Sequence, residues 1–149
     1  MPSQIKVDEI KNVAGQYKIK TNVLEGQTTA SSITVQGEGT ATTNLQQGLC
    51  KFWTQTVGSG TVSNNDSFNS SGLTDNGTGD YTHTFTNAMG NNDYSVTGSQ
   101  GGNTSNDEVR IPQNAGDFAT DSFQVNTLKT GVALNDSEHV CTQVAGDLA

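Results

Sequence analysis

Hydrophobic and polar residues alternate in several short stretches of the chain from residue 51 onward. Alternation with a period of two is typical of β-strands that bury one face, because successive side chains point to opposite sides of a strand. Phe52 and Trp53 are consecutive, so the pattern places them on opposite faces of one strand. The apolar positions that we expect to share one core are Phe52, Phe85, Tyr94, Val96, Phe123 and Val125.

This alternation predicts seven short strands between residues 51 and 149. They are Lys51–Val57, Ser67–Asn69, Tyr81–Thr86, Tyr94–Gly98, Glu108–Ile111, Ser122–Leu128 and Glu138–Val144. Glycine, asparagine and aspartate are frequent between them, as in Thr74–Gly79, and these residues are typical of tight turns. Short strands at regular spacing predict an all-β fold, with a small antiparallel β-sandwich or jelly-roll-like domain over residues 51–149.

The first 24 residues differ because they contain two alternating segments, residues 4–10 and 17–23, and few other apolar groups. Two strands with so few apolar side chains are not stable alone in water. Residues 1–24 are therefore predicted to pair or dock with another copy, with a neighbouring protein or with the C-terminal domain, and the sequence leaves these three open. The candidate docking residues are Ile5, Val7, Ile10, Tyr17 and Ile19.

Residues 25–50 are rich in threonine, serine, glycine and glutamine, with one apolar island at Ile33–Val35. This composition predicts a stalk or linker. Its β-branched residues also favour pairing with identical segments in an oligomer. Gly37 and Gly39 mark the expected bend.

The chain carries a formal net charge of −8, from 7 basic and 15 acidic residues. Residues 1–50 are balanced, so the whole excess lies in residues 51–149, whose basic residues are Lys51, Arg110 and Lys129. Clustered lysine and arginine bind phosphate backbones, so nucleic acid is not an expected partner. No stretch approaches the roughly 20 apolar residues of a membrane span, and the N-terminus lacks the apolar core of a secretory signal. Membrane insertion is therefore not expected.

The stretch Asp75–Asp80, with the sequence DNGTGD, superficially resembles a calcium-binding loop. An EF-hand loop needs glycine at its sixth position and glutamate at its twelfth, where this chain has Asp80 and Thr86. Asn-Gly between strands is instead a hairpin signal, because glycine tolerates positive φ. We therefore expect a turn at Asn76–Gly77, with no metal and no cofactor.

His83 and His139 have no partner in a catalytic motif, and the chain has no GxSxG or similar nucleophile motif. They are expected to be ordinary surface or interface histidines, and the protein is not expected to be an enzyme. Cys50 and Cys141 lie far apart without a CxxC pattern. They are expected either to form a disulfide or to remain as two small buried thiols.

The aromatic residues Trp53, Phe68, Tyr81 and Tyr94 admit two interpretations. Aromatic side chains on strands usually belong to the core, since each buries a large apolar area. Exposed rings would instead form a platform on which sugars stack, as in carbohydrate-binding modules. Trp53 and Tyr94 are the candidate receptor contacts of this second interpretation.

Several stretches resemble a module of tailed-bacteriophage fibre and virion structural proteins. The main match runs over Asp66–Asn69, Leu73–Thr82, Phe85–Met89 and Asp93–Tyr94. Lys51–Trp53 and Ser122–Val125 are similar to strands of the same module. The opening, Ser3–Ile10, is similar to the start of many fibre proteins of marine phages.

This resemblance implies a structural component of a virion that is exposed on the particle surface. It implies a homotrimer that docks to capsid or tail proteins through its N-terminus and displays its β domain for contact with a host glycan or protein. Tail fibre, head fibre, capsid decoration and adaptor all remain open. The alternative function is a stand-alone carbohydrate-binding module or an adhesin domain.

Overall fold

The computed structural model describes residues 22–24, 33–36, 39–102, 107–110, 117–129 and 133–149 of the chain. The first described elements are the strands β1 (Thr34–Gln36) and β2 (Thr42–Asn44) and the short helix α1 (Leu45–Gly48). The strands that follow are β3 (Phe52–Val57), β4 (Ser63–Phe68), β5 (Ser70–Gly77), β6 (Asp80–Phe85), β7 (Ser95–Gly101), β8 (Asp107–Arg110), β9 (Ser122–Lys129), β10 (Ala133–Leu134) and β11 (His139–Ala145). The described strands pair in antiparallel fashion, and the predicted all-β fold class is confirmed.

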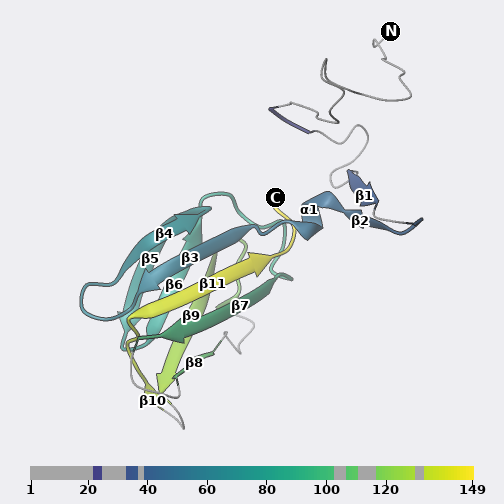
Figure 1. Ribbon diagram of the computed structural model, residues 1–149. Helices are drawn as coiled ribbons and strands as arrows, with labels where there is room; N and C mark the ends of the chain where they lie inside the picture. The colour runs from purple at the N-terminus through teal and green to yellow at the C-terminus, as the bar shows by residue number, and fades with distance from the viewer. Residues whose placement is uncertain (1–21, 25–32, 37–38, 103–106, 111–116, 130–132) are drawn as a thin grey trace, which may run out of the picture.

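Strands β3 to β11 form two sheets that pack face to face (Figure 1). The four-stranded sheet has the order β4-β3-β11-β7. The five-stranded sheet has the order β10-β9-β6-β5, and β8 also pairs with β9. Asn126 of β9 pairs with both Asp80 of β6 and Arg110 of β8, so β6 and β8 lie on opposite edges of β9. The domain is β-sandwich-like, and its jelly-roll topology stays a prediction.

Aromatic side chains from both sheets fill the space between them. Phe52 of β3 packs edge-on against Phe85 of β6 and Phe123 of β9, with ring centroids 5.3 Å and 5.1 Å apart. Such edge-to-face contacts add to the free energy gained by burying each ring. All six positions predicted to share one core are at most 8% exposed. Alternation along the strands therefore identified the core correctly.

The chain crosses from one sheet to the other at Asn69, between β4 and β5. Asn69 has a φ of 60°, a left-handed conformation that asparagine tolerates better than most residues. Its side-chain amide donates to the Lys51 carbonyl at 2.9 Å, and its side-chain oxygen accepts from the Asn87 backbone N–H at 2.7 Å. The predicted strand Ser67–Asn69 is confirmed only at Ser67 and Phe68, the end of β4, because Asn69 forms the corner at which two longer strands meet.

The hairpin predicted around Asn76–Gly77 is confirmed, since β5 and β6 pair across it. The turn is tighter than expected, because β5 continues to Gly77 and β6 begins at Asp80. Gly79 has a φ of 63°, and a Cβ at this position would lie 2.6 Å from the Thr127 backbone oxygen. Both the backbone angle and the close approach of Thr127 therefore require glycine at position 79.

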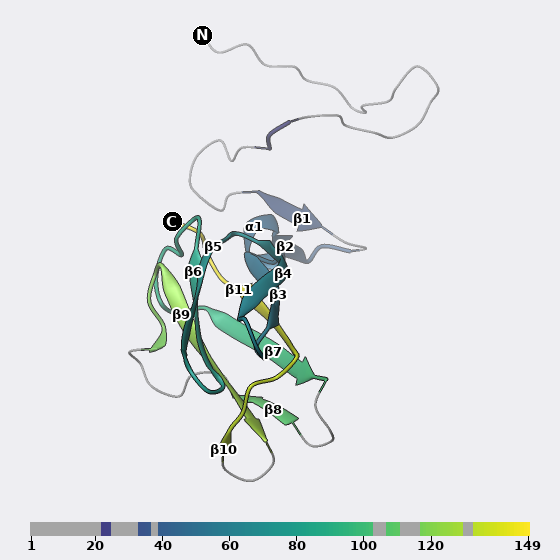
Figure 2. The same ribbon diagram turned by 90° about the vertical axis from the view of Figure 1, so that its left-hand side faces the viewer.

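The described residues 33–36 and 39–50 form a separate arm that extends from one end of the sandwich, beside the C-terminus (Figure 1, Figure 2). In the arm, β1 and β2 pair as a two-stranded sheet, with Val35 opposite Thr43. Gly39, near which the bend was predicted, lies between them with a φ of 113°, whereas Gly37 lies outside the described residues. Helix α1 was not predicted, and it begins after Asn44, whose side chain accepts from the Gln47 N–H at 3.0 Å.

Lys51 links the arm to the sandwich through hydrogen bonds to two arm carbonyls. It is only 3% exposed, and its Nζ donates to the carbonyls of Gln46 and, at 2.9 Å, of Leu49. The lysine therefore adds a donor to carbonyl groups at the end of α1, where the Gln46 carbonyl also accepts from the Leu49 backbone N–H at 3.3 Å. Burial lowers the pKa of Lys51, while the charge of Asp147 acts in the opposite direction. Gln47 also donates to Asp147 at 3.4 Å, which ties α1 to the C-terminal segment.

The N-terminal docking segment predicted for residues 1–24 is described only at residues 22–24. The predicted docking residues Ile5, Val7, Ile10, Tyr17 and Ile19 lie outside the described residues and stay predictions. Val23 and Leu24 are 73% and 63% exposed. In the sequence, these two residues precede both the arm and the sandwich.

Candidate functional site

The outer face of the four-stranded sheet carries two rows of side chains that point away from the core. In the first row, Trp53 of β3 lies opposite Gln143 of β11, which lies opposite Thr97 of β7. The second row lies two residues along each strand and consists of Gln55, Cys141 and Ser99. Residues two apart share a face of a strand, so all six side chains line one surface.

A groove of about 440 Å³ lies over these two rows. It shares Thr97 and Gln143 with a second depression of about 180 Å³, which reaches Leu49 and Ser95 at the arm end of the sheet. We call the two together the outer groove. The side chains of β7 on this face are small, so the groove lies lower there than at Trp53. Among the described residues that line it, none is charged.

The polar side chains of the outer groove are available for a ligand. Within the described part of the chain, no side-chain hydrogen bond is formed by Trp53, Gln55, Thr97, Ser99 or Gln143. Polar residues of the same strands that point inward behave differently: the hydroxyl groups of Thr54 and Thr142 bond each other at 2.8 Å. The sheet therefore satisfies its inner polar groups internally and leaves its outer ones to water or a ligand.

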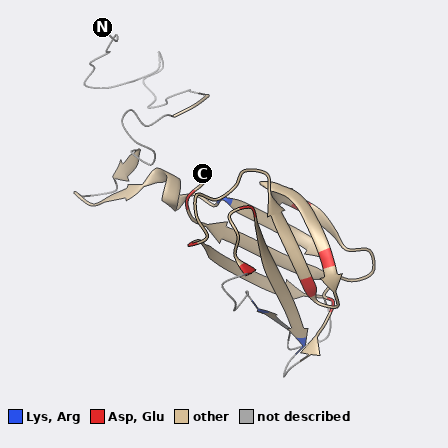
Figure 3. Ribbon diagram, turned by 180° about the vertical axis from the view of Figure 1, so that it is seen from behind, with Lys and Arg blue, Asp and Glu red and all other residues tan. Residues whose placement is uncertain are grey.

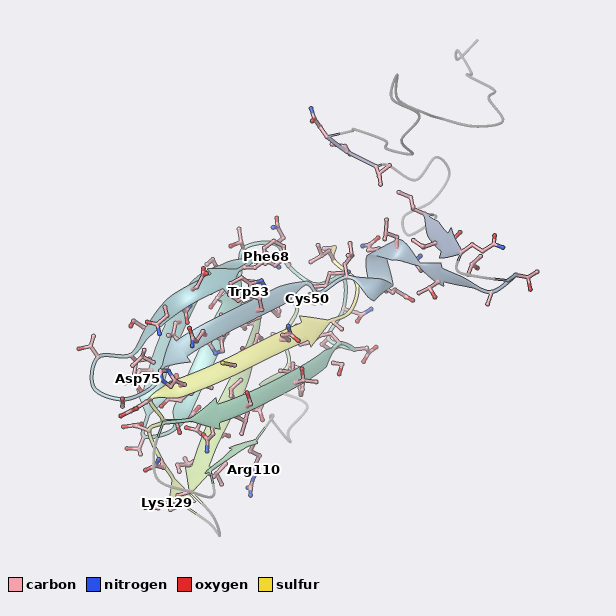
Figure 4. All side chains as sticks on the ribbon, in the orientation of Figure 1. Cys50, Trp53, Phe68, Asp75, Arg110 and Lys129 are labelled. Atoms are coloured by element: carbon pink, nitrogen blue, oxygen red, sulfur yellow. The ribbon has the colours of Figure 1, made fainter. Side chains whose placement is uncertain are left out.

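An exposed aromatic pair borders the outer groove. Phe68 of β4 lies directly opposite Trp53 and is 51% exposed, while Trp53 is half-buried (Figure 4). Trp53 thus lies on the surface, as the proposed receptor contact requires. Sequence reasoning weighed Phe68 as an aromatic residue but did not connect it with Trp53, because the β3–β4 register is not visible in the sequence.

Tyr94, the second predicted receptor contact, requires a correction. It is only 8% exposed, and its hydroxyl donates to the carbonyls of Ala119 and Ser122, each at 2.9 Å. Burial raises the pKa of the Tyr94 hydroxyl to about 12. Tyr94 is therefore a core residue whose polar group is already bonded, and it does not reach a receptor on the surface.

The two cysteines do not form a disulfide, and both thiols are free. Phe52 pairs with Val144 and Gln55 with Cys141, so Cys50 lies about five residues, or about 16 Å, from Cys141 along the sheet. The alternative of two buried thiols is wrong for Cys50, which is exposed. Cys141 is half-buried in the outer groove.

His83 is a core residue, which corrects the expected surface or interface position. Its ring is fully buried, stacks on Phe123 at 5.2 Å and packs edge-on against Phe52 at 5.6 Å. Neither ring nitrogen has a hydrogen-bond partner among the described residues. Burial lowers the pKa of His83 to about 4, so the ring is neutral at physiological pH. His139, in contrast, is exposed as expected.

The carboxylates of the acidic turn between β5 and β6 accept hydrogen bonds from the turn and from β9. Asp75 accepts from the Gly77 N–H at 3.0 Å, and Asp80 accepts from the Gln124 side chain at 2.5 Å. Within the described residues, no group of three or more histidine, cysteine, aspartate or glutamate side chains is arranged to hold a metal ion. The Asp75 carboxylate thus supports the hairpin that the sequence predicted, and the Asp80 carboxylate links β6 to β9.

Fold and site together define an all-β protein with an exposed arm and an uncharged groove on one sheet. Comparisons with protein-family models, with curated proteins and with solved structures found no match. In the part of the chain that the structure describes, no helix has the length and apolar character needed to cross a membrane. The arm and the outer groove are therefore the two features from which a function is inferred.

Proposed function

We propose that the protein is a structural component of a phage virion. In this proposal it is a short homotrimeric fibre that docks to the particle through its N-terminal region. The β-sandwich is then displayed outward for contact with the host surface. The observation that carries the proposal is the arm, an exposed two-stranded sheet that projects from a self-contained sandwich. The resemblance of Asp66–Tyr94 to phage fibre modules supports it.

The arm has the properties of a segment that needs a partner. All three residues of β1 are exposed, and Val35 and Leu49 are 51% and 55% exposed. An isolated two-stranded sheet is marginal at best in water, and its free edges can accept further strands. Identical arms from two other copies would supply those strands. Residues 1–50 carry no net charge, so electrostatic repulsion would not oppose this association.

The sandwich has the properties of a displayed domain. Its core is formed by its own two sheets, so it needs no partner to bury apolar area. The full net charge of −8 lies in residues 51–149, which keeps such a domain soluble. Figure 3 shows that most positions along the sandwich strands are uncharged and that acidic positions are scattered among them. The Lys51 contacts would hold the domain in a constant orientation to the arm.

Mass measurement of the full chain under native conditions tests the trimer. We expect a species of three times the 15.6 kDa chain mass. Val35→Asp should dissociate it, because it places a charge on the exposed face of β1. Thr74→Asp, at an exposed strand position of the sandwich, is the matched control and should leave the trimer intact. A wild-type protein that remains monomeric at micromolar concentration would overturn the trimer.

Analysis of purified phage particles tests the virion assignment. The protein should be present in the particles in a copy number divisible by three, and antibodies against the sandwich should label the particle surface. Removal of residues 1–24 should abolish incorporation without unfolding the sandwich. Particles that lack the protein, or that retain it after this truncation, would contradict docking through the N-terminus.

A stand-alone carbohydrate-binding module is the second candidate function, and the outer groove is the observation that favours it. A module that stands alone is expected as a monomer, since its binding site is complete within one chain. The native mass therefore separates the two candidates. A trimer with an occupied groove fits the first, whereas a monomer with an occupied groove fits the second.

A further inference from the structure

We propose that the outer groove binds a neutral oligosaccharide, with Trp53 as the residue on which a sugar ring stacks. This inference names the ligand of the displayed sandwich, and its biological setting rests on the proposed function. Its structural basis is independent of the arm, because every residue that lines the larger part of the groove belongs to β3, β7 or β11.

The shape of the groove suits an extended ligand. Its outward positions on β7 run from Ser95 to Ser99, a distance of about 13 Å along the strand. The larger part alone, about 440 Å³, falls within the range of small-molecule sites. The groove lies on an open sheet face and is not an enclosed cavity, so a longer chain can continue past both ends. A short oligosaccharide fits this geometry better than a compact molecule does.

The hydrogen-bonding groups of the groove suit sugar hydroxyls. Gln55 and Gln143 each offer an amide that donates and accepts, and Thr97 and Ser99 offer hydroxyls that do the same. Sugar hydroxyls also donate and accept, so either orientation of the ligand finds partners. These four side chains have no hydrogen bonds to break within the described residues, so binding costs the displacement of water and the ordering of the side chains.

The aromatic border of the groove suits the apolar face of a sugar ring. Trp53 presents a large ring system beside Gln143, and Phe68 extends this apolar surface onto β4. A pyranose has C–H groups on its faces and hydroxyls around its edge. It can therefore pack a face on Trp53 while its edge bonds the amides and hydroxyls of β7 and β11.

The charges around the groove favour a neutral ligand. Nucleic acids and acidic polysaccharides need lysine or arginine near their anionic groups, and no described residue lining the groove is charged. Lys51 is buried, while Arg110 and Lys129 belong to β8 and β9 of the other sheet. Asp66, exposed and directly opposite Gln55, adds a negative charge at the rim. That carboxylate can accept from a sugar hydroxyl but repels an anion.

Trp53 is the only tryptophan of the chain, so its fluorescence reports directly on the groove. The full-length protein is titrated with maltohexaose, cellohexaose, mannohexaose and chitohexaose, and with an acidic oligogalacturonate for comparison. We expect a saturable shift of Trp53 emission with at least one neutral sugar and none with oligogalacturonate. Thr97→Ala and Gln143→Ala should each weaken binding about fivefold, the usual effect of losing one hydrogen bond.

Thr74→Ala is the matched control, since Thr74 is an exposed strand threonine on the other sheet. It should bind as the wild type does, and calorimetry with Trp53→Ala should detect no binding. Four results would overturn the groove assignment: no response to any neutral sugar, a preference for oligogalacturonate, equal weakening by Thr74→Ala, or Trp53 emission that shifts on dilution of the protein alone. The last would mean that a second copy covers the groove.

The native mass of the same samples separates this inference from the proposed function. A trimer that binds none of the sugars would contradict the groove assignment and would be consistent with the fibre. A monomer that binds a sugar, with the expected effects of Thr97→Ala and Gln143→Ala, would contradict the trimeric fibre and support the groove assignment.

Discussion

The sandwich and the arm are both rich in threonine, glycine and polar residues, yet they bury very different amounts of apolar surface. Among its described residues the sandwich buries eleven hydrophobic side chains, with Phe52, Tyr81 and Val125 fully inside. None of the described arm residues, 33–36 and 39–50, is buried. Both regions form antiparallel strands, so strand formation alone does not make a stable unit. What separates them is the presence of aromatic and branched side chains at every second position.

This difference suits the two regions to different tasks. A sandwich with its own core can fold before assembly and hold a binding surface in a constant shape. In the proposed fibre, an arm without a core would gain its stability from other copies or from the particle. The predictions that follow test how far the two regions are independent, beginning with the largest expected effect.

Phe52→Ala should destabilise the sandwich by about 3–5 kcal/mol, because it removes a fully buried ring that contacts both Phe85 and Phe123. Denaturant unfolding followed by circular dichroism measures this loss. Phe68→Ala, at a half-exposed position of the same sheet, is the matched control and should cost less than about 1 kcal/mol. Equal losses would show that Phe68 is buried by a partner.

Acidification should weaken the sandwich through His83. Its pKa is about 4 in the folded state and about 6.5 in the unfolded chain, so the unfolded state takes up the proton first. The stability present above pH 6.5 is lost as the pH falls from 6.5 to 4, by on the order of 3 kcal/mol. Unfolding free energies measured across this range should show the decline.

His83→Phe should flatten that pH dependence, because phenylalanine keeps the ring contacts with Phe52 and Phe123 and cannot be protonated. His139→Phe, at the exposed histidine, should leave the dependence unchanged. A decline that survives His83→Phe would assign it to the acidic groups of the domain instead.

Lys51→Met should loosen the connection between the regions by about 1–2 kcal/mol, because two carbonyls at the end of α1 lose a charged donor. Hydrogen exchange should speed up in residues 45–49 while β6 and β9 keep their protection. Lys129→Met removes an exposed lysine from β9 and should change neither segment. Faster exchange throughout the sandwich would mean that arm and sandwich unfold as one unit.

Val35→Ala should change the unfolding free energy of the sandwich by less than about 0.5 kcal/mol, since Val35 is half-exposed in the arm. Val125→Ala, the same change at a fully buried position, should cost about 2 kcal/mol. Trp53 fluorescence during denaturation follows the sandwich in both variants. A large effect of Val35→Ala would show that the sandwich depends on the arm.

The sequence was sufficient to predict the fold class, the core positions and most strands after residue 51. Period-two alternation marks buried faces, and each strand that showed it was found. The corner at Asn69 was missed because its cause is a side chain that bonds Lys51 and Asn87, which are distant in the sequence. Helix α1 was missed because one turn of helix leaves no periodic pattern.

The candidate site was predictable only at Trp53. The sequence predicted that Trp53 and Phe52 point to opposite faces of one strand. Because Phe52 lies in the core, Trp53 lies on the outer face. Thr97, Gln143 and Phe68 join it through strand register, which depends on which strands become neighbours. His83 was misjudged although it alternates with Tyr81 and Phe85, because its polar ring was expected at the surface and the packed sheets bury it. Tyr94 was predicted both as a core position and as a receptor contact, and only the core position is confirmed.

The position of β3 also determines how the molecule would bear a mechanical load. In the proposed fibre, a ligand in the outer groove would pull on β7 and β11 as well as on β3, while the arm would restrain the start of β3. This strand is bonded to β4 on one edge and to β11 on the other. Antiparallel hydrogen bonds lie perpendicular to the strands, so tension along β3 shears many of them at once and does not open them one by one. In the proposed fibre, the load between host and particle would therefore pass through the hydrogen bonds of β3, which resist it together.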